Sequence, residues 1–265
     1  MSDTTTTSGG AQTPLSDQPL LALKGISKSF GPVEALKDVD MEVRPGEVVG
    51  LLGDNGAGKS TLIKAIAGVQ PADEGDTHFE GRPVTLNSPQ AATGLGIATV
   101  YQDLALCENL DIVANLFLGQ ERIDTAAKVL DETEMEQKTE ELLGSLGVTT
   151  IRSVRTEVER LSGGQRQAIA IARSLLGEPK MVILDEPTAA LGVVQTAQVL
   201  ELVRRLREQG LGVVVISHNL ENVYSVADRI VVLRLGRVAA SFDRRATPRE
   251  EVVAAITGAA VRAPA

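Results

Sequence analysis

The segment that most constrains this chain is a glycine-rich loop that fits the pattern G-x-x-x-x-G-K-S. It follows the apolar run from Gly46 to Leu52 and leads into residues 59–67, which have a helical pattern and end at Gly68. Glycines in such a loop let backbone N–H groups turn inward around phosphate oxygens, and the helix that follows adds the partial positive charge of its N-terminus. The alternative is a glycine-rich turn that matches by accident, which average residue usage gives in about one chain in a hundred. The sequence therefore predicts a phosphate-binding loop in an α/β fold, formed by Gly53, Asp54, Asn55, Gly56, Ala57, Gly58, Lys59, Ser60 and Thr61.

Two acidic residues at the end of another apolar run are the expected partners of this loop. In a loop of this kind the ammonium group of Lys59 reaches the β- and γ-phosphates of a nucleotide, and the Ser60 hydroxyl ligates Mg²⁺. The run from Met181 to Leu184 ends in Asp185 and Glu186, and α/β sheets bind ligands at the carboxyl ends of their strands. We expect Asp185 to hold Mg²⁺, directly or through water, and Glu186 to orient or deprotonate the attacking water. Taken alone, two acids at a strand end are more often a solvated turn or a helix cap.

Composition excludes several other classes of protein. The chain has 265 residues, enough for one large domain or a domain with an inserted lobe. Its formal net charge of −9 argues against a protein whose main partner is nucleic acid. Its one cysteine, Cys107, excludes a disulfide framework and is commonest in a reducing compartment. No apolar run approaches 18 residues, so we expect no membrane-spanning segment.

The pattern along the chain predicts one α/β domain over residues 19–258. We expect residues 1–18 to be a disordered lead-in, because they are polar and low in complexity, and residues 259–265 to be a C-terminal tail. Mainly helical segments over about 103–164 predict a helical lobe inserted into the α/β core. Short apolar runs separated by helices predict a parallel sheet, and a final hairpin turns at Gly236. Thr247 to Glu250 fits a capping box with Pro at the first helical position, which would open the last helix.

A third motif, Leu161-Ser162-Gly163-Gly164-Gln165, opens a helix whose apolar residues recur with a 3.6-residue period. A serine N-cap followed by flexible glycines would explain its local structure, but neither Gln165 nor its occurrence with the other two motifs. With this motif the sequence resembles the ABC ATPase family, whose signature it is, from Leu20 to Gly258. The resemblance implies a P-loop NTPase fold of the ABC-ATPase type, with a mixed sheet core and an inserted helical subdomain. ATP and Mg²⁺ are the cofactors that it implies.

The resemblance also implies roles for single residues. Gln102 lies where the family has the glutamine that touches Mg²⁺ and the attacking water, and His218 where it has the histidine that contacts the γ-phosphate. Without the resemblance, a lone histidine after a strand is most often a surface residue. Phe30 matches the aromatic that stacks on adenine, although the sequence alone favours a place in the core. One position departs from the family, because Gly192 stands where an aspartate commonly makes a contact between two subunits.

The family works as pairs of cassettes, and this implies the partners. Ser162, Gly163, Gly164 and Gln165 of one subunit would cap ATP held by Lys59 of a second, so we expect a dimer, with a homodimer favoured. A transporter built on this chain needs separate transmembrane permease subunits, which would place it in the cytoplasm on the inner face of the membrane, and a sugar-binding protein acts indirectly. Segments such as Tyr101 to Leu106 and Pro187 to Gly192 are similar to cassettes of bacterial ribose-, xylose- and fructose-type importers. The alternatives are a cassette for another substrate and a soluble ATPase of the iron–sulfur assembly type.

Overall fold

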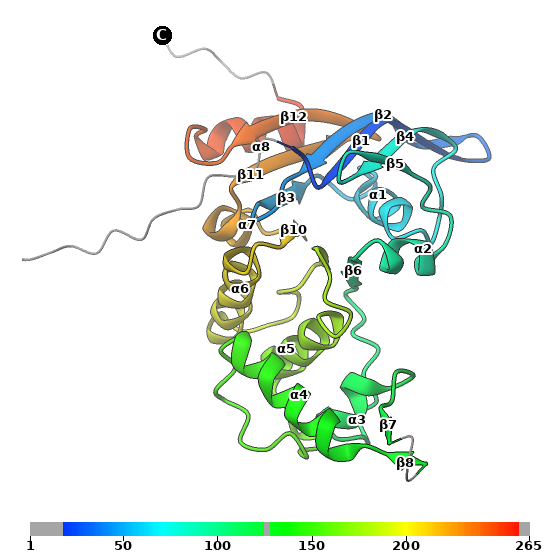
Figure 1. The fold of residues 1–265 in the computed structure, drawn as a ribbon. Helices are drawn as coiled ribbons and strands as arrows, with labels where there is room; N and C mark the ends of the chain where they lie inside the picture. Colours follow the sequence, from blue (N-terminus) through cyan, green and yellow to red (C-terminus); the bar gives the residue numbers. More distant parts are fainter. Residues whose placement is uncertain (1–17, 125–127, 260–265) are drawn as a thin grey trace, which may run out of the picture.

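The computed structural model describes residues 18–124 and 128–259, and its centre is a six-stranded sheet (Figure 1). The expected lead-in, apart from residue 18, and the expected tail, apart from residue 259, lie outside the described residues. The strand order is β12-β11-β3-β10-β9-β6. All neighbouring pairs are parallel except β11 and β12, so the mixed sheet is confirmed. The strands are β3 Val48–Leu52, β6 Ile97–Val100, β9 Met181–Asp185, β10 Gly212–Ile216, β11 Arg229–Arg234 and β12 Arg237–Asp243.

Both faces of this sheet are covered, which explains why its central strands are almost wholly apolar. On β10, for example, Val213 and Val215 belong to one buried cluster, whereas Val214 and Ile216 belong to another. This alternation follows from the two-residue period of a strand and is typical of parallel sheets. The first cluster packs beneath four helices, α5 Gly163–Ser174, α6 Val193–Glu208, α7 Leu220–Val226 and α8 Arg249–Thr257.

The other face is covered by helix α1 and a second sheet that the sequence pattern did not indicate. This sheet is antiparallel and has the strand order β2-β1-β4-β5. It shares a buried cluster with α1, to which Leu62 and Ile66 of α1 and Phe79 of β4 contribute. A short helix, α2 Pro89–Gly94, then leads to β6. The elements of this layer are β1 Leu21–Phe30, β2 Val33–Val43, α1 Lys59–Ile66, β4 Glu74–Phe79 and β5 Arg82–Val84.

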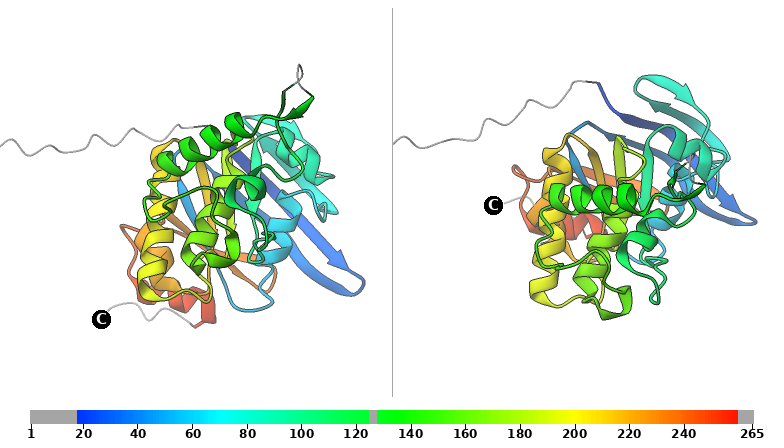
Figure 2. Two further views of the ribbon diagram at one scale, coloured as in Figure 1. Left: turned by 90° about the horizontal axis from the view of Figure 1, so that it is seen from below. Right: turned by 60° about the horizontal axis from the view of Figure 1, so that its bottom comes forward.

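The segment between β6 and α5 forms a lobe at one side of the sheets (Figures 1 and 2). It contains α3 Ile112–Phe117, α4 Glu132–Ser145 and a 3₁₀ turn at Val158–Arg160, as the expected inserted helical subdomain requires. It also contains a small hairpin of β7 Ile123–Asp124 and β8 Val129–Leu130, which the sequence did not predict. Within the described residues, none of the helices is long and apolar enough to cross a bilayer.

One local prediction is wrong by a single residue. Helix α8 begins at Arg249, so Pro248 is its N-cap rather than its first helical residue, and no side chain caps this end. The carbonyl of Thr247 instead accepts a hydrogen bond from the hydroxyl of Tyr224, at 3.3 Å. The last helix therefore begins without a side-chain cap, and the residue before its N-cap is bonded to α7.

Candidate functional site

The register of the parallel strands aligns the carboxyl ends of β3, β10, β9 and β6. Leu51 of β3 pairs with Ile216 of β10, which pairs with Asp185 of β9, while Val100 of β6 pairs with Leu184. Each strand is followed directly by one of the predicted motifs. The phosphate loop follows β3, His218 follows β10, Glu186 follows β9 and Gln102 follows β6. Four segments that are far apart in the sequence therefore meet at one edge of the sheet.

The phosphate loop has the backbone conformation that its glycines allow. Gly56 and Gly58 have positive φ angles of 77° and 106°. A Cβ at Gly58 would lie 2.7 Å from the carbonyl oxygen of Ala35, so a side chain would not fit there. Lys59 is the first residue of α1, and its ammonium group donates hydrogen bonds to the carbonyl oxygens of Gly53 at 2.8 Å and Asp54 at 3.0 Å. The ammonium group of Lys59 is thus held by the backbone of its own loop.

Asp185 lies in an environment that disfavours its charge. Burial raises its pKa above the ordinary value, and the neighbouring Glu186 carboxylate raises it further, while Lys59 and Lys64 act in the opposite direction. Lys59 is thus close enough to Asp185 to act on its charge. Tyr101 is also nearby, because burial and then the Asp185 carboxylate raise the pKa of its phenol. A carboxylate whose charged form is destabilised by its surroundings is characteristic of functional sites.

Glu186 shows two features that point to a catalytic role. Its φ angle is +48°, a left-handed conformation that is uncommon outside glycine. Its Oε2 atom is buried and accepts no hydrogen bond. The Nδ1 atom of His218 lies 2.9 Å from Oε2, but the contact lacks the geometry of a hydrogen bond. A buried carboxylate oxygen without a donor is suited to accept a proton from water.

The two other residues expected around the nucleotide are exposed. Gln102 lies two residues beyond the end of β6, and its side chain reaches solvent. Phe30 is the last residue of β1 and is 44% exposed, so it does not belong to the core that the sequence alone favoured. Lys28 lies over its ring, with Nζ 5.7 Å from the ring centre. An exposed aromatic ring is available for stacking.

The signature segment is held by local hydrogen bonds and lies apart from the phosphate loop of its own chain. Ser162 caps α5 by accepting a hydrogen bond from the N–H of Gln165 at 3.3 Å, and the Gln165 side chain accepts one from the Ser162 N–H at 2.9 Å. The Gln165 amide also donates to the carbonyl of Thr150 at 3.1 Å. Among the described residues, none of the polar contacts of this segment reaches the phosphate loop. The structure therefore does not bring these two predicted groups together in one chain.

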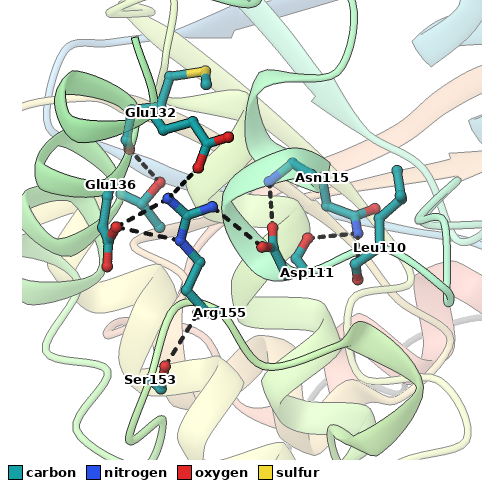
Figure 3. Close-up of polar contacts among 10 residues, drawn as sticks. Leu110, Asp111, Asn115, Glu132, Glu136, Ser153 and Arg155 are labelled. Atoms are coloured by element: carbon teal, nitrogen blue, oxygen red, sulfur yellow. Dashed lines mark hydrogen bonds and ion pairs between the residues drawn. The ribbon is translucent and has the colours of Figure 1, made fainter. Parts of the chain in front are cut away.

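An ion-pair network in the lobe fixes the chain just before the signature segment (Figure 3). Arg155 contacts Glu132 and Glu136 of α4 at 3.1 Å and 3.0 Å. It also contacts Asp111, the N-cap of α3, at 3.5 Å. On α3, Asn115 is fully buried and its side chain both accepts a hydrogen bond from the Cys107 N–H and donates one to the Cys107 carbonyl. The signature segment is therefore joined to both helices of the lobe.

Helix α5 also holds the segment that follows Gln102. Arg173 donates hydrogen bonds to the carbonyl oxygens of Leu104 at 2.7 Å and Ala105 at 2.9 Å. Burial lowers the pKa of its guanidinium group, while the nearby Cys107 acts in the opposite direction. Arg173 matches no functional motif in the sequence, and its contacts join positions 68 and 69 residues apart.

Two further features near the site had no signal in the sequence. Val193 and Val194, the first residues of α6, are 88% and 73% exposed. Residues on either side of this pair lie against the signature segment, because a Cβ at Gly163 would be 2.8 Å from the side chain of Leu191 and one at Gly164 would be 3.1 Å from that of Gln195. Thr188 and Asn222 form a hydrogen bond at 3.0 Å between the loop after Glu186 and helix α7.

The residues at the sheet edge fit a divalent cation bound together with phosphates. The Ser60 hydroxyl, the Asp185 carboxylate and the Gln102 amide all offer oxygen atoms, which are the ligands that Mg²⁺ prefers. Mg²⁺ is usually bound by one or two carboxylates and by substrate phosphates, rather than by a complete protein cage. The buried Asp185 carboxylate beside a phosphate loop matches this arrangement.

Comparison with known proteins gives the family. The family model described as "ABC transporter" matches residues 36–189, more than half of the chain. The xylose/arabinose import ATP-binding protein XylG of Sulfolobus acidocaldarius is 49% identical over 91% of this chain and 95% of its own length. The fructose import ATP-binding protein FrcA of Rhizobium meliloti is 44% identical over 92% and 96%. The ribose import ATP-binding protein RbsA 2 of Rubrobacter xylanophilus is 41% identical, and this chain spans 46% of its length.

Solved structures agree with these relatives. A nucleotide-free ATP-binding cassette from an ABC transporter aligns with a TM-score of 0.77 and 28% identity, over 90% of this chain and 95% of that one. A dimeric cassette bound to ADP and phosphate aligns with a TM-score of 0.71 and 27% identity, over 86% of this chain and all of that one. The chain therefore belongs to the ABC transporter family, as one of its ATP-binding cassettes, an ATPase.

Proposed function

We propose that this chain hydrolyses ATP to energise the import of a monosaccharide through separate permease subunits in the membrane, with a sugar-binding protein acting upstream. The observation that carries the proposal is the 49% identity with a xylose/arabinose import ATP-binding protein over 95% of that protein's length. The similarity to a fructose import protein over nearly its whole length supports the same substrate class. The subunit would lie on the cytoplasmic side of the membrane, bound to its permeases.

The site geometry supports a mechanism for hydrolysis. Backbone N–H groups of the phosphate loop and the Lys59 ammonium group would bind the β- and γ-phosphates, and Thr61 would add its backbone N–H. Ser60, Asp185 and Gln102 would hold Mg²⁺, which neutralises phosphate charge when it is bound. The exposed ring of Phe30 would stack on adenine.

Glu186 would act as the general base. As the water oxygen attacks the γ-phosphorus, one water proton passes to Oε2 of Glu186, and the bond from the γ-phosphorus to the bridging oxygen breaks. The products are ADP and inorganic phosphate. His218, whose Nδ1 lies 2.9 Å from this oxygen, would orient the carboxylate and contact the γ-phosphate from its other nitrogen.

We infer that the active form is a dimer in which each site is completed by the other cassette. The exposed Ser162 lies at the N-terminus of α5, where an anion binds favourably, yet it makes no contact with Lys59 of its own chain. Val193 and Val194 extend the same exposed surface with apolar groups. The dimeric cassette among the structural neighbours supports this arrangement.

The experiment is to isolate the full chain from its native membranes with its associated subunits and reconstitute the complex in vesicles. ATP-dependent uptake of labelled xylose, arabinose, fructose or ribose is the expected result, together with a permease of several spans in the complex. The Lys59→Ala variant should abolish both uptake and ATP turnover. A chain that hydrolyses ATP but binds no membrane protein would contradict the transport role and favour a soluble ATPase.

A further inference from the structure

One hydrogen bond near the site has no part in the function described so far. Asn222 on α7 donates from Nδ2 to Oγ1 of Thr188 at 3.0 Å. The Thr188 side chain is almost fully buried, and that of Asn222 is half-buried. A hydrogen bond shielded from water in this way is stronger than one at the surface.

The two residues lie in the segments that present Glu186 and His218. Thr188 is two residues after Glu186, in a turn in which the Ala189 N–H donates to the carbonyl of Glu186 at 3.0 Å. Asn222 is in the first turn of the helix that begins just after His218. In the part of the chain that the structure describes, this is the only side-chain hydrogen bond between residues 186–192 and residues 217–226.

Both catalytic groups depend on their surroundings for their orientation. Glu186 has a left-handed backbone conformation, which persists only where neighbouring structure enforces it. The side chain of His218 is 73% exposed, so packing does not fix its ring. The position of the imidazole is therefore set by the backbone at the start of α7, which the Asn222–Thr188 bond attaches to the Glu186 loop.

We propose that Asn222 and Thr188 are a positioning pair that sets the separation of Glu186 Oε2 from His218 Nδ1 and thereby the rate of ATP hydrolysis. The proposal rests on the proposed hydrolytic roles of Glu186 and His218. Neither Asn222 nor Thr188 needs to touch the nucleotide.

The test uses the full chain with four variants and a control. Asn222→Ala and Thr188→Val each remove the hydrogen bond, a double variant removes both partners, and Thr188→Ser keeps the hydroxyl. Because alanine has a higher helix propensity than asparagine, Asn222→Ala should not weaken α7 itself. Ser225→Ala is the matched control, since the Ser225 hydroxyl on the same helix bonds only the Asn222 carbonyl in the described structure.

We expect kcat for ATP hydrolysis to fall about tenfold or more in Asn222→Ala and Thr188→Val, with KM for ATP unchanged. Thr188→Ser should keep most of the rate, Ser225→Ala all of it, and the double variant should be no slower than either single one. A second readout does not need turnover. The chain has only two histidines, His78 and His218, so ring ¹⁵N resonances should shift for His218 in the two disruptive variants and stay constant for His78.

Wild-type kcat and unchanged His218 resonances in Asn222→Ala would overturn the proposal. So would rate losses that add in the double variant, because the two residues would then act independently. These outcomes differ from a failure of the proposed function, in which the wild type would not hydrolyse ATP or Lys59→Ala would remain active. The resonance shifts test the pair in either case.

Discussion

The two ends of the six-stranded sheet differ in how their polar groups are satisfied. At the amino end, Arg229 bonds both carboxylate oxygens of Glu47 at 2.8 Å and 3.3 Å, and Glu47 is only 2% exposed. Beside it, Asp228 accepts a hydrogen bond from the Val48 N–H at 3.0 Å and one from Arg207 at 3.3 Å. These contacts join the starts of β3 and β11 to the end of α6.

At the carboxyl end the same sheet carries groups that the fold does not satisfy. Burial raises the pKa of Asp185, the backbone of Glu186 is left-handed, and the Oε2 atom of Glu186 accepts no hydrogen bond. Such features are costly and cluster where a protein binds or reacts. The comparison shows that the amino end of the sheet is arranged for stability and the carboxyl end for chemistry. Substitutions at the amino end should therefore change stability, and substitutions at the carboxyl end should change activity.

The largest effect is expected for Glu186→Gln at the carboxyl end. The amide keeps the size of the side chain but cannot accept the water proton, so ATP turnover should fall about a thousandfold, equivalent to about 4 kcal/mol in the barrier. ATP binding should persist because Lys59, Ser60 and Asp185 are unchanged. Turnover assays and nucleotide titrations on the same preparation measure the two properties.

The same variant gives a test of assembly. With hydrolysis blocked, ATP should hold two copies together across the signature segment, and size exclusion should show a dimer with ATP but not with ADP. Equal dimerisation with ADP, or normal turnover, would contradict the roles assigned to Glu186 and Ser162.

At the amino end, Arg229→Met should cost about 3 kcal/mol of unfolding free energy while leaving ATP affinity unchanged. The substitution leaves the buried Glu47 carboxylate without its cation, and removing one partner of a buried pair is strongly destabilising. Urea denaturation measures the loss. Adding Glu47→Gln should recover most of it, whereas Arg249→Met, which breaks an exposed pair with Glu221, should cost under about 1 kcal/mol.

A smaller effect is expected at the exposed surface beside the carboxyl end. In the Glu186→Gln background, Val193→Asp should weaken the ATP-dependent dimer about tenfold, because an 88% exposed apolar side chain would become a charge inside the contact. Monomer stability should not fall, since an acidic residue is favourable in the first turn of a helix. Val129→Asp, at an exposed valine in the lobe, is the control and should leave the dimer unchanged.

The same two edges show what could be predicted from the sequence. The phosphate loop, Asp185, Glu186 and His218 each follow an apolar strand directly, so chain order alone places them at the carboxyl edge. The roles of the phosphate loop, Asp185 and Glu186 were predicted from their motifs, whereas that of His218 came from the family resemblance, and all of them stay proposals. The stabilising pair of Glu47 and Arg229 is 182 residues apart, and Thr188 is 34 residues from Asn222. Only the strand order of the sheet brings such residues together, and no local pattern encodes it.

Two further features of the structure, the second sheet and the start of α8, were not predicted correctly from local sequence patterns. In the second sheet β1 pairs with β2 and β4 with β5, which are neighbours in the chain, whereas β1 and β4 lie far apart. The pairing that joins these two halves therefore has no hairpin signal. Thr247 had the sequence of an N-cap, but its carbonyl accepts the Tyr224 hydroxyl, and α8 begins beyond Pro248. The first case is a pairing between distant strands, and in the second the residue before the N-cap of α8 is bonded to helix α7.

The smallest effect is expected on the melting temperature of Asp185→Asn. Its sign should be opposite to that of the matching substitution at the amino end of the sheet. The pKa of Asp185 is raised in the folded state, so the folded protein binds the proton of this carboxyl group more tightly than the unfolded chain does. The charged carboxylate therefore costs stability once the pH rises above its ordinary pKa, and the cost persists at neutral pH. Without nucleotide, Asp185→Asn should slightly raise the melting temperature at pH 7, and the gain should vanish as the pH falls toward the ordinary pKa of an aspartate. Asp228→Asn is the matched control at the other edge and should lower the melting temperature, because the carboxylate there is bonded by Arg207 and the Val48 N–H. A loss of stability in Asp185→Asn at pH 7 would mean that this carboxylate supports the fold, as Asp228 does, and that the contrast between the two edges is wrong.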